Sequence, residues 1–176
     1  MRAAQNKVDE ATSEVEKFQR RQSALNDRAI ALSKTLAASR ERLRKSILDG
    51  SEFEDAAFME QGTIETEYKG CNSALEMLVT EILPWANADL LAARVELGFA
   101  KSAALLRAAN ARAGRIAQEL SAVADAEGAI EVNVRDTPTV AVLMAEHHNL
   151  FGLANQGHGE LKKIREHLKS TTNKKG

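Results

Sequence analysis

The stretch that decides the fold is VDEATSEVEKFQRRQSALNDRAIALSKTLAASRERLRKS, residues 8–46. Mostly apolar or small side chains recur in it at alternating steps of three and four residues, the spacing of a coiled-coil helix. We call these positions the first seam: Val8, Ala11, Val15, Phe18, Gln22, Leu25, Ala29, Leu32, Leu36, Ser39, Leu43 and Ser46. A helix of about 40 residues is roughly 60 Å long. A small globule cannot bury such a helix, so we expect equally long helices beside it.

Composition agrees with long helices and narrows the class of function. The 176 residues are 44% hydrophobic but only 4% aromatic, with two prolines and a formal net charge of −1. Such a composition is typical of coiled coils and long helices. The neutral balance gives no field that would attract nucleic acid or an anionic membrane, and no apolar run is long enough to span a bilayer. We therefore expect a cytoplasmic protein that binds neither nucleic acid nor membrane.

A second long helix is expected to fold back on the first. Gly50 can end the first helix, and Ser51 with Glu54 forms a capping box for the next. Residues 1–50 hold 11 Lys/Arg and 7 Asp/Glu, a net of +4, whereas residues 51–83 hold 1 and 8, a net of −7. This opposition favours an antiparallel pair. The apolar positions of the second helix, here the second seam, are Ile64, Tyr68, Cys71, Leu75, Leu78, Ile82 and Trp85.

The rest of the sequence predicts a third long helix, followed by an extended stretch and two shorter helices. Pro84 should end or kink the second helix, and Asn87 is a suitable N-cap for a helix through about residue 126. The alternation at Ile130–Val134 predicts an extended stretch. Two short helices should follow, 138–151 and 160–169, separated by the glycine-rich loop 152–159. The expected protein is all-α, with two to three long antiparallel coiled-coil-like helices in residues 1–127 and a small C-terminal segment in 128–176.

No motif indicates catalysis, a metal or a cofactor. His147 and His148 are adjacent, so on a helix they point about 100° apart and cannot easily share one ion. Cys71 lies on the second seam, where a buried cysteine acts as a small hydrophobe. The loop 152–159 lacks the Lys-Ser/Thr of a phosphate loop and follows a helix rather than a strand. We therefore expect a non-enzymatic protein without cofactors.

Self-association and protein binding are the functions that this pattern favours. We expect a homo-oligomer, most simply a dimer, that presents a surface to another macromolecule. Trp85, beside Pro84, is either an interface anchor or a plug that closes the core where helices turn. The candidate interface residues are Trp85, the first-seam residues Leu25, Leu32 and Leu36, and the extended residues Ile130, Val132 and Val134, which could add a strand to a partner.

The alternative is a ligand-sequestering protein. In that case basic side chains at a subunit interface would bind an anionic, nucleotide-like small molecule. The candidate ligand-binding residues are Arg107, Arg112, Arg115, Arg135 and His158.

Overall fold

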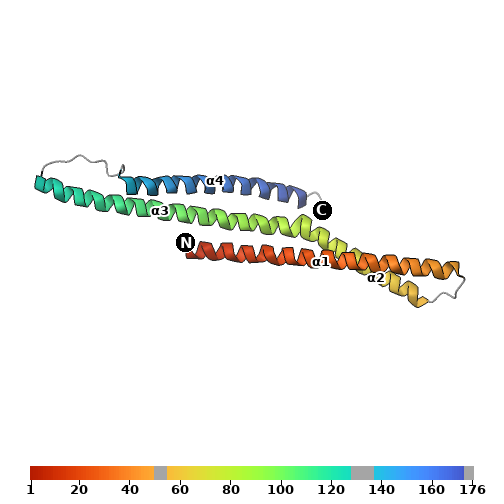
Figure 1. The fold of residues 1–176 in the computed structure, drawn as a ribbon. Coiled ribbons are helices and arrows are strands. Elements are labelled where there is room, and N and C mark those ends of the chain that lie inside the picture. The colour runs from red at the N-terminus through yellow and green to blue at the C-terminus, as the bar shows by residue number, and fades with distance from the viewer. Residues whose placement is uncertain (50–54, 128–136, 173–176) are drawn as a thin grey trace. The chain divides into compact units, whose positions relative to one another are not determined.

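The computed structural model describes residues 1–49, 55–127 and 137–172, and nearly all of them are helical (Figure 1). The elements are α1 (Arg2–Leu48), α2 (Asp55–Met77), the π-helical segment η1 (Leu78–Ile82), α3 (Leu83–Glu127) and α4 (Pro138–Thr172). No strand occurs in these described ranges. The all-α class with long helices is confirmed. The expected extended stretch Ile130–Val134 and the capping box at Ser51 lie outside the described residues.

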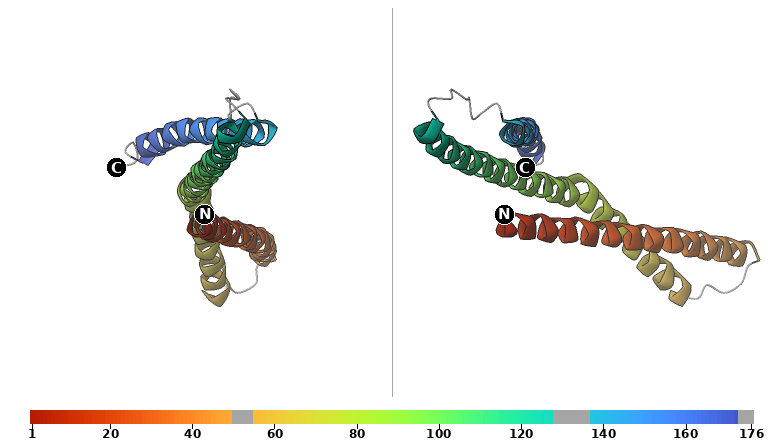
Figure 2. Two further views of the ribbon diagram at one scale, coloured as in Figure 1. Left: turned by 90° about the vertical axis from the view of Figure 1, so that its left-hand side faces the viewer. Right: turned by 60° about the vertical axis from the view of Figure 1, so that its left-hand side comes forward.

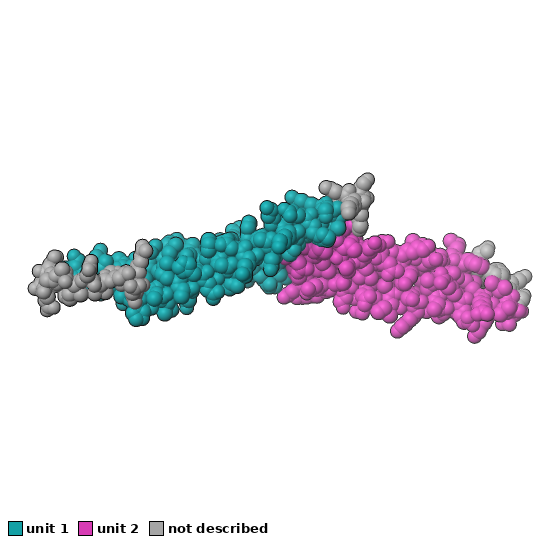
Figure 3. Space-filling model, turned by 90° about the horizontal axis from the view of Figure 1, so that it is seen from above, with its two compact units in different colours: residues 1–12, 88–176 teal, residues 13–87 magenta. Residues whose placement is uncertain are grey.

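The helices form two compact units, coloured separately in Figure 3. Unit 1 comprises residues 1–12 and 88–176, and unit 2 comprises residues 13–87. The division of the chain into domains at residue 127 is not tested by these contacts and stays a prediction.

The first seam is the buried side of α1. All of its twelve positions are buried or half-buried, and every other residue from 8 to 48 except Thr12 is exposed. Val15, Ala29, Leu32 and Leu36 each retain only 6% of their accessible surface. The heptad pattern therefore predicted the buried face of α1 correctly. No glycine or proline interrupts residues 2–48, so the helix is continuous.

Unit 2 is an antiparallel helical hairpin made of α1 from residue 13 onward and the α2–η1 helix (Figures 1 and 2). All second-seam positions are buried or half-buried, and Leu78 retains 2% of its accessible surface. Two ion pairs join the helices: Arg28 Nη2 lies 2.8 Å from Glu67 Oε2, and Arg40 Nη2 lies 3.5 Å from Glu65 Oε1. These pairs are largely solvent-exposed, so each contributes about 1 kcal/mol or less. Their main effect is on the choice of partner helix and register.

The helix does not end at Pro84, and the expected N-cap at Asn87 is wrong. The chain passes from α2 through η1 into α3 without leaving a helical conformation. Proline has no N–H, and its ring crowds the carbonyl four residues earlier. The wider π turn, in which the Leu83 N–H bonds to the Leu78 carbonyl five residues back, precedes the proline and accommodates it. Asn87 instead donates its side-chain amide to the Leu83 carbonyl, at 2.9 Å.

Unit 1 is built on α3 and α4, which lie antiparallel and side by side (Figures 1 and 2). The N-terminal turns of α1 add to it: Ala4 is buried, and Lys7 Nζ lies 2.8 Å from Glu96 Oε1. Most buried or half-buried positions of α4 recur at heptad spacing, and Met144 and Arg165 are half-buried beside them. We call the positions at that spacing the third seam: Val140, Leu143, His147, Leu150, Ala154, Gly157, Leu161 and Leu168.

The two expected C-terminal helices and the loop between them are wrong, because α4 is one helix of 35 residues. Three glycines in this stretch favoured a loop, since each weakens a helix by about 1 kcal/mol relative to alanine. Packing against α3 outweighs that penalty. A Cβ added to Gly157 would lie 2.9 Å from Val95 Cγ2, and one added to Gly98 would lie 3.2 Å from Ala154 Cβ. The glycines at 98 and 157 thus let the two helices approach closely.

Over the described residues, no helix is both long enough and apolar enough to cross a membrane.

Candidate functional site

The described core contains one polar contact between helices, at Ser102 of α3 and His147 of α4. Ser102 retains 1% of its accessible surface, and its Oγ lies 2.8 Å from His147 Nδ1. The Ser102 carbonyl lies 3.0 Å from the same nitrogen, and Ser102 Oγ lies 3.3 Å from the His147 carbonyl. Because Ser102 and His147 are 45 residues apart, no local sequence pattern could have paired them.

Either neutral tautomer of the His147 ring can form hydrogen bonds with Ser102 in this arrangement. If Nδ1 carries no proton, the Ser102 hydroxyl donates to it. If Nδ1 is protonated, it donates to the Ser102 carbonyl, and the hydroxyl donates to the His147 carbonyl. No buried side-chain nitrogen or oxygen of the described residues lacks a hydrogen-bond partner. The contact is therefore a complete hydrogen-bonded pair that links the two helices at one register.

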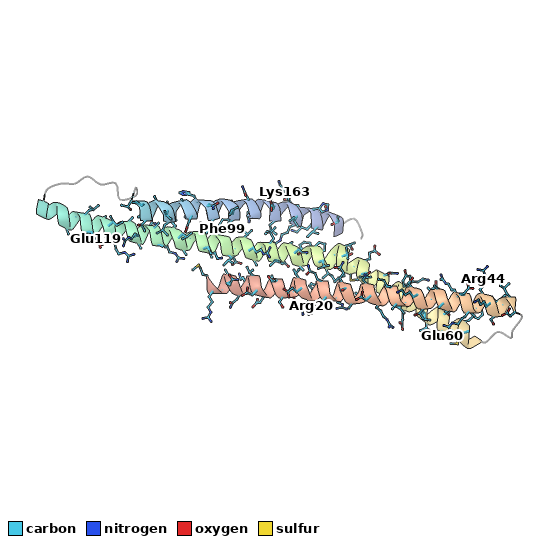
Figure 4. The ribbon with its side chains drawn as sticks, viewed as in Figure 1. Arg20, Arg44, Glu60, Phe99, Glu119 and Lys163 are labelled. Carbon is cyan, nitrogen blue, oxygen red and sulfur yellow. The ribbon has the colours of Figure 1, made fainter. Side chains whose placement is uncertain are left out.

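Aromatic rings extend this contact along the α3–α4 interface. The His147 ring centroid lies 5.9 Å from that of Phe151, which in turn lies 5.7 Å from Phe99 in an edge-on arrangement. Phe99 comes from α3 and points toward α4 (Figure 4). Edge-on aromatic pairs add about 0.5–1.5 kcal/mol to the burial of their surface. The rings and the polar pair together define how α4 lies on α3.

The geometry of Ser102 and His147 does not suit nucleophilic catalysis. In a Ser-His-Asp arrangement the serine faces Nε2 and a carboxylate orients Nδ1. Here the serine itself occupies the Nδ1 side, and its hydroxyl is inaccessible to a substrate. The contact can hold two helices together, which requires no access from solvent.

The ring centroid of His148 lies 5.2 Å from that of His147, but His148 takes no part in the contact with Ser102. His148 Nδ1 lies 2.8 Å from the Met144 carbonyl on its own helix, and His158 is exposed. Among the described residues, no group of three or more His, Cys, Asp or Glu side chains is arranged to hold a metal ion. Cys71 is a half-buried free thiol on the second seam.

The ligand-binding residues expected from the sequence are not gathered in one place. Arg107, Arg112 and Arg115 are exposed along α3. His158 follows Gly157, which packs against Val95, so it lies near a part of α3 at least twelve residues from the nearest of these arginines. At about 1.5 Å per residue that separation is roughly 18 Å or more. Arg135 lies outside the described residues, and anionic-ligand binding stays a prediction.

The interface residues expected from the sequence lie mainly inside the chain's own helix pairs. Leu32 and Leu36 are buried, and Leu25 and Trp85 are half-buried. Ile130, Val132 and Val134 lie outside the described residues. Contact of any of these residues with a second chain stays a prediction.

Four exposed apolar residues at the closed end of the hairpin were not singled out from the sequence. Ile47 and Leu48 end α1 with exposed fractions of 54% and 75%. Phe58 and Met59, near the start of α2, have exposed fractions of 49% and 74%. We call these four residues the hairpin-end cluster. One feature of the sequence could have identified this cluster: neither Leu48 nor Met59 belongs to the first or the second seam.

Comparison of the chain with protein-family models, with curated proteins and with solved structures found no match.

Proposed function

We propose that this chain is a non-enzymatic helical assembly protein, which self-associates and presents a surface to a macromolecular partner. The observation that carries the proposal is the exposure of the hairpin-end cluster: Ile47, Leu48, Phe58 and Met59 retain 54%, 75%, 49% and 74% of their accessible surface. Single exposed apolar residues are ordinary on protein surfaces. Here four exposed apolar residues lie within the last two residues of α1 and the first five of α2, and such a concentration marks this end of the hairpin as an interaction site.

The energy available from covering this cluster is large enough to matter. Full burial of a Leu, Ile, Phe or Met side chain contributes about 1.5–3 kcal/mol. These four side chains are roughly half to three-quarters exposed. Their joint burial would therefore contribute on the order of 3–8 kcal/mol before the entropy of association is subtracted.

Burial of the seams within the chain changes where the proposed interface is expected. Leu32 and Leu36 already lie in the core of unit 2, so a second chain could reach them only by opening the hairpin. Self-association is therefore assigned to exposed positions. In the described core, the one polar pair between helices is Ser102–His147, and Ser102 is closed off from solvent. This burial favours a structural role for the pair. Assembly, with a dimer as its first species, is the function that these residues favour.

The test is the mass of the full chain in solution, measured by size-exclusion chromatography with light scattering over a concentration series. We expect the average mass to rise above 19.2 kDa with concentration. Replacing Leu48 and Met59 together by serine should reduce that rise. The matched control is Leu153→Ser on α4, which removes an apolar side chain of similar exposure, 57%, elsewhere. A constant monomer mass at every concentration would remove self-association from the proposal.

A further inference from the structure

Helix α2 has a second periodic face, on the side opposite the second seam. Its residues follow one another at steps of four and three, offset by two residues from the second seam, which rotates them about 200° around the helix. We call this the α2 outer face, and all of its residues are exposed: Met59, Thr63, Thr66, Gly70, Ser73 and Met77.

The α2 outer face carries no charge and allows a close approach. Met59 and Met77 stand at its two ends with exposed fractions of 74% and 54%. Between them, the hydroxyls of Thr63 and Thr66 donate to carbonyls of their own helix, at 3.0 and 2.8 Å. A Cβ added to Gly70 would meet nothing within 4 Å. As at Gly114, no described residue lies close enough to require a glycine here, so the position has room for a side chain from another molecule.

Helix α1 has a face with the same step order on the side opposite the first seam. We call this the α1 outer face, and its residues are exposed as well: Ile30, Lys34, Ala37, Glu41, Arg44 and Leu48. Ile30 and Leu48 stand at its ends with exposed fractions of 48% and 75%. Long polar side chains, including that of Arg44 (Figure 4), occupy its middle.

We infer that the α2 outer face of one copy binds the α1 outer face of a second copy. The two faces have equal lengths and the same spacing, so the apolar ends of one meet the methionines of the other. Between those ends, the long side chains of Lys34, Glu41 and Arg44 lie over threonine, glycine and serine, which leave room for them.

Charge complementarity supports α1 rather than α2 as the helix that covers the α2 outer face. Residues 51–83 carry a net charge of −7, and the exposed Glu60 and Glu76 lie beside the α2 outer face. Two copies of α2 would repel each other. Residues 1–50 carry +4, with Lys34, Arg44 and Lys45 exposed on the side of the α1 outer face.

The contact must join different chains in a head-to-tail manner. Because the two seams face each other within the hairpin, the two outer faces point away from each other. Each copy in a dimer thus keeps one unused outer face, and further copies can add to it. This inference rests on the proposed self-association and identifies the surfaces that would produce it.

The first experiment is sedimentation velocity of the full chain over a concentration series, comparing Gly70→Glu with Gly114→Glu. Both glycines are exposed in long helices, and an added Cβ meets nothing within 4 Å at either. Glutamate favours a helix over glycine, so both variants should fold. We expect Gly70→Glu to associate about tenfold more weakly or worse, because it places a charge in the contact. Gly114→Glu should associate like the unmodified protein.

The second experiment tests the head-to-tail arrangement itself. The variant Lys34→Glu with Arg44→Glu spoils the α1 outer face and leaves the α2 outer face intact, whereas Gly70→Glu does the reverse. Each variant alone should be a monomer. Their equimolar mixture should form a dimer that does not grow with concentration, because only one productive contact remains.

The outcomes separate the two proposals. Association of Gly70→Glu equal to that of Gly114→Glu would overturn the assigned faces and leave self-association standing. A mixture that stays monomeric would also overturn them. A monomeric unmodified protein at all concentrations would overturn both the proposed self-association and the assignment of the two outer faces.

Discussion

Alanine in place of Gly157 should destabilise the protein, although the same change at Gly152 should stabilise it. Both glycines lie within α4, so both substitutions gain about 1 kcal/mol of helix propensity. At Gly152 an added Cβ meets nothing within 4 Å, whereas at Gly157 it would lie 2.9 Å from Val95 Cγ2. Val95 is β-branched and buried, so it cannot easily rotate away.

The expected difference follows from these two contributions. Overpacking a well-packed interface costs about 1–3 kcal/mol. Subtracting the propensity gain leaves Gly157→Ala between neutral and about 2 kcal/mol less stable, while Gly152→Ala is about 1 kcal/mol more stable. The two variants should therefore differ by about 1–3 kcal/mol, which corresponds to roughly 2–12 °C in Tm for a chain of this size.

The measurement is thermal and urea unfolding followed by far-ultraviolet circular dichroism, with both variants at the same protein concentration. The ranking of the two variants decides the result. If Gly157→Ala were as stable as Gly152→Ala, the close approach of α4 to Val95 would not be a feature of the folded protein. The explanation for the continuous α4 helix would then fail.

Three further substitutions test other parts of the structure by the same unfolding measurements. Ser102→Ala should lower the free energy of unfolding by about 1 kcal/mol, because it removes the hydroxyl of the buried pair; the exposed Ser121→Ala on the same helix should change it little, and equal effects would contradict the pairing. Leu36→Ala should cost about 2–5 kcal/mol, whereas Ile30→Ala in dilute monomer should cost well under half of that; a reversed order would contradict the assigned buried side of α1. Arg28→Ala should change stability by at most about 1 kcal/mol, since its ion pair is largely exposed, and a loss of several kcal/mol would show that the pair does more than align the hairpin.

Helix continuity was predictable only in part. The first helix was correct from sequence because nothing in it opposes the helical pattern. At Pro84 and in residues 152–159, local preferences oppose a helix by amounts that packing and a π turn can offset. Such a balance depends on what lies across the interface, and a reading along the chain does not include those atoms. The pattern at Val140, Leu143, His147, Leu150, Ala154, Gly157 and Leu161 was nevertheless present in the sequence as an unbroken heptad spacing.

Contacts between distant residues were even less predictable from the sequence than helix continuity. Ser102 and His147 meet across 45 residues, and neither belongs to a recognisable motif. The seams of α1 and α2 are periodic in the sequence, but periodicity alone does not say whether a seam is covered by the same chain or by a second one. Burial of Leu32 and Leu36 within the hairpin settled that question for the first seam.

By itself the sequence determined that this protein is built of long helices and which side of α1 and α2 is buried. Both follow from the spacing of side chains along a helix, which is a local property. Only the tertiary structure decided that α4 is continuous, that Ser102 bonds to His147, and which apolar residues stay in water. These depend on contacts between residues far apart in the chain, whose energies no local spacing contains.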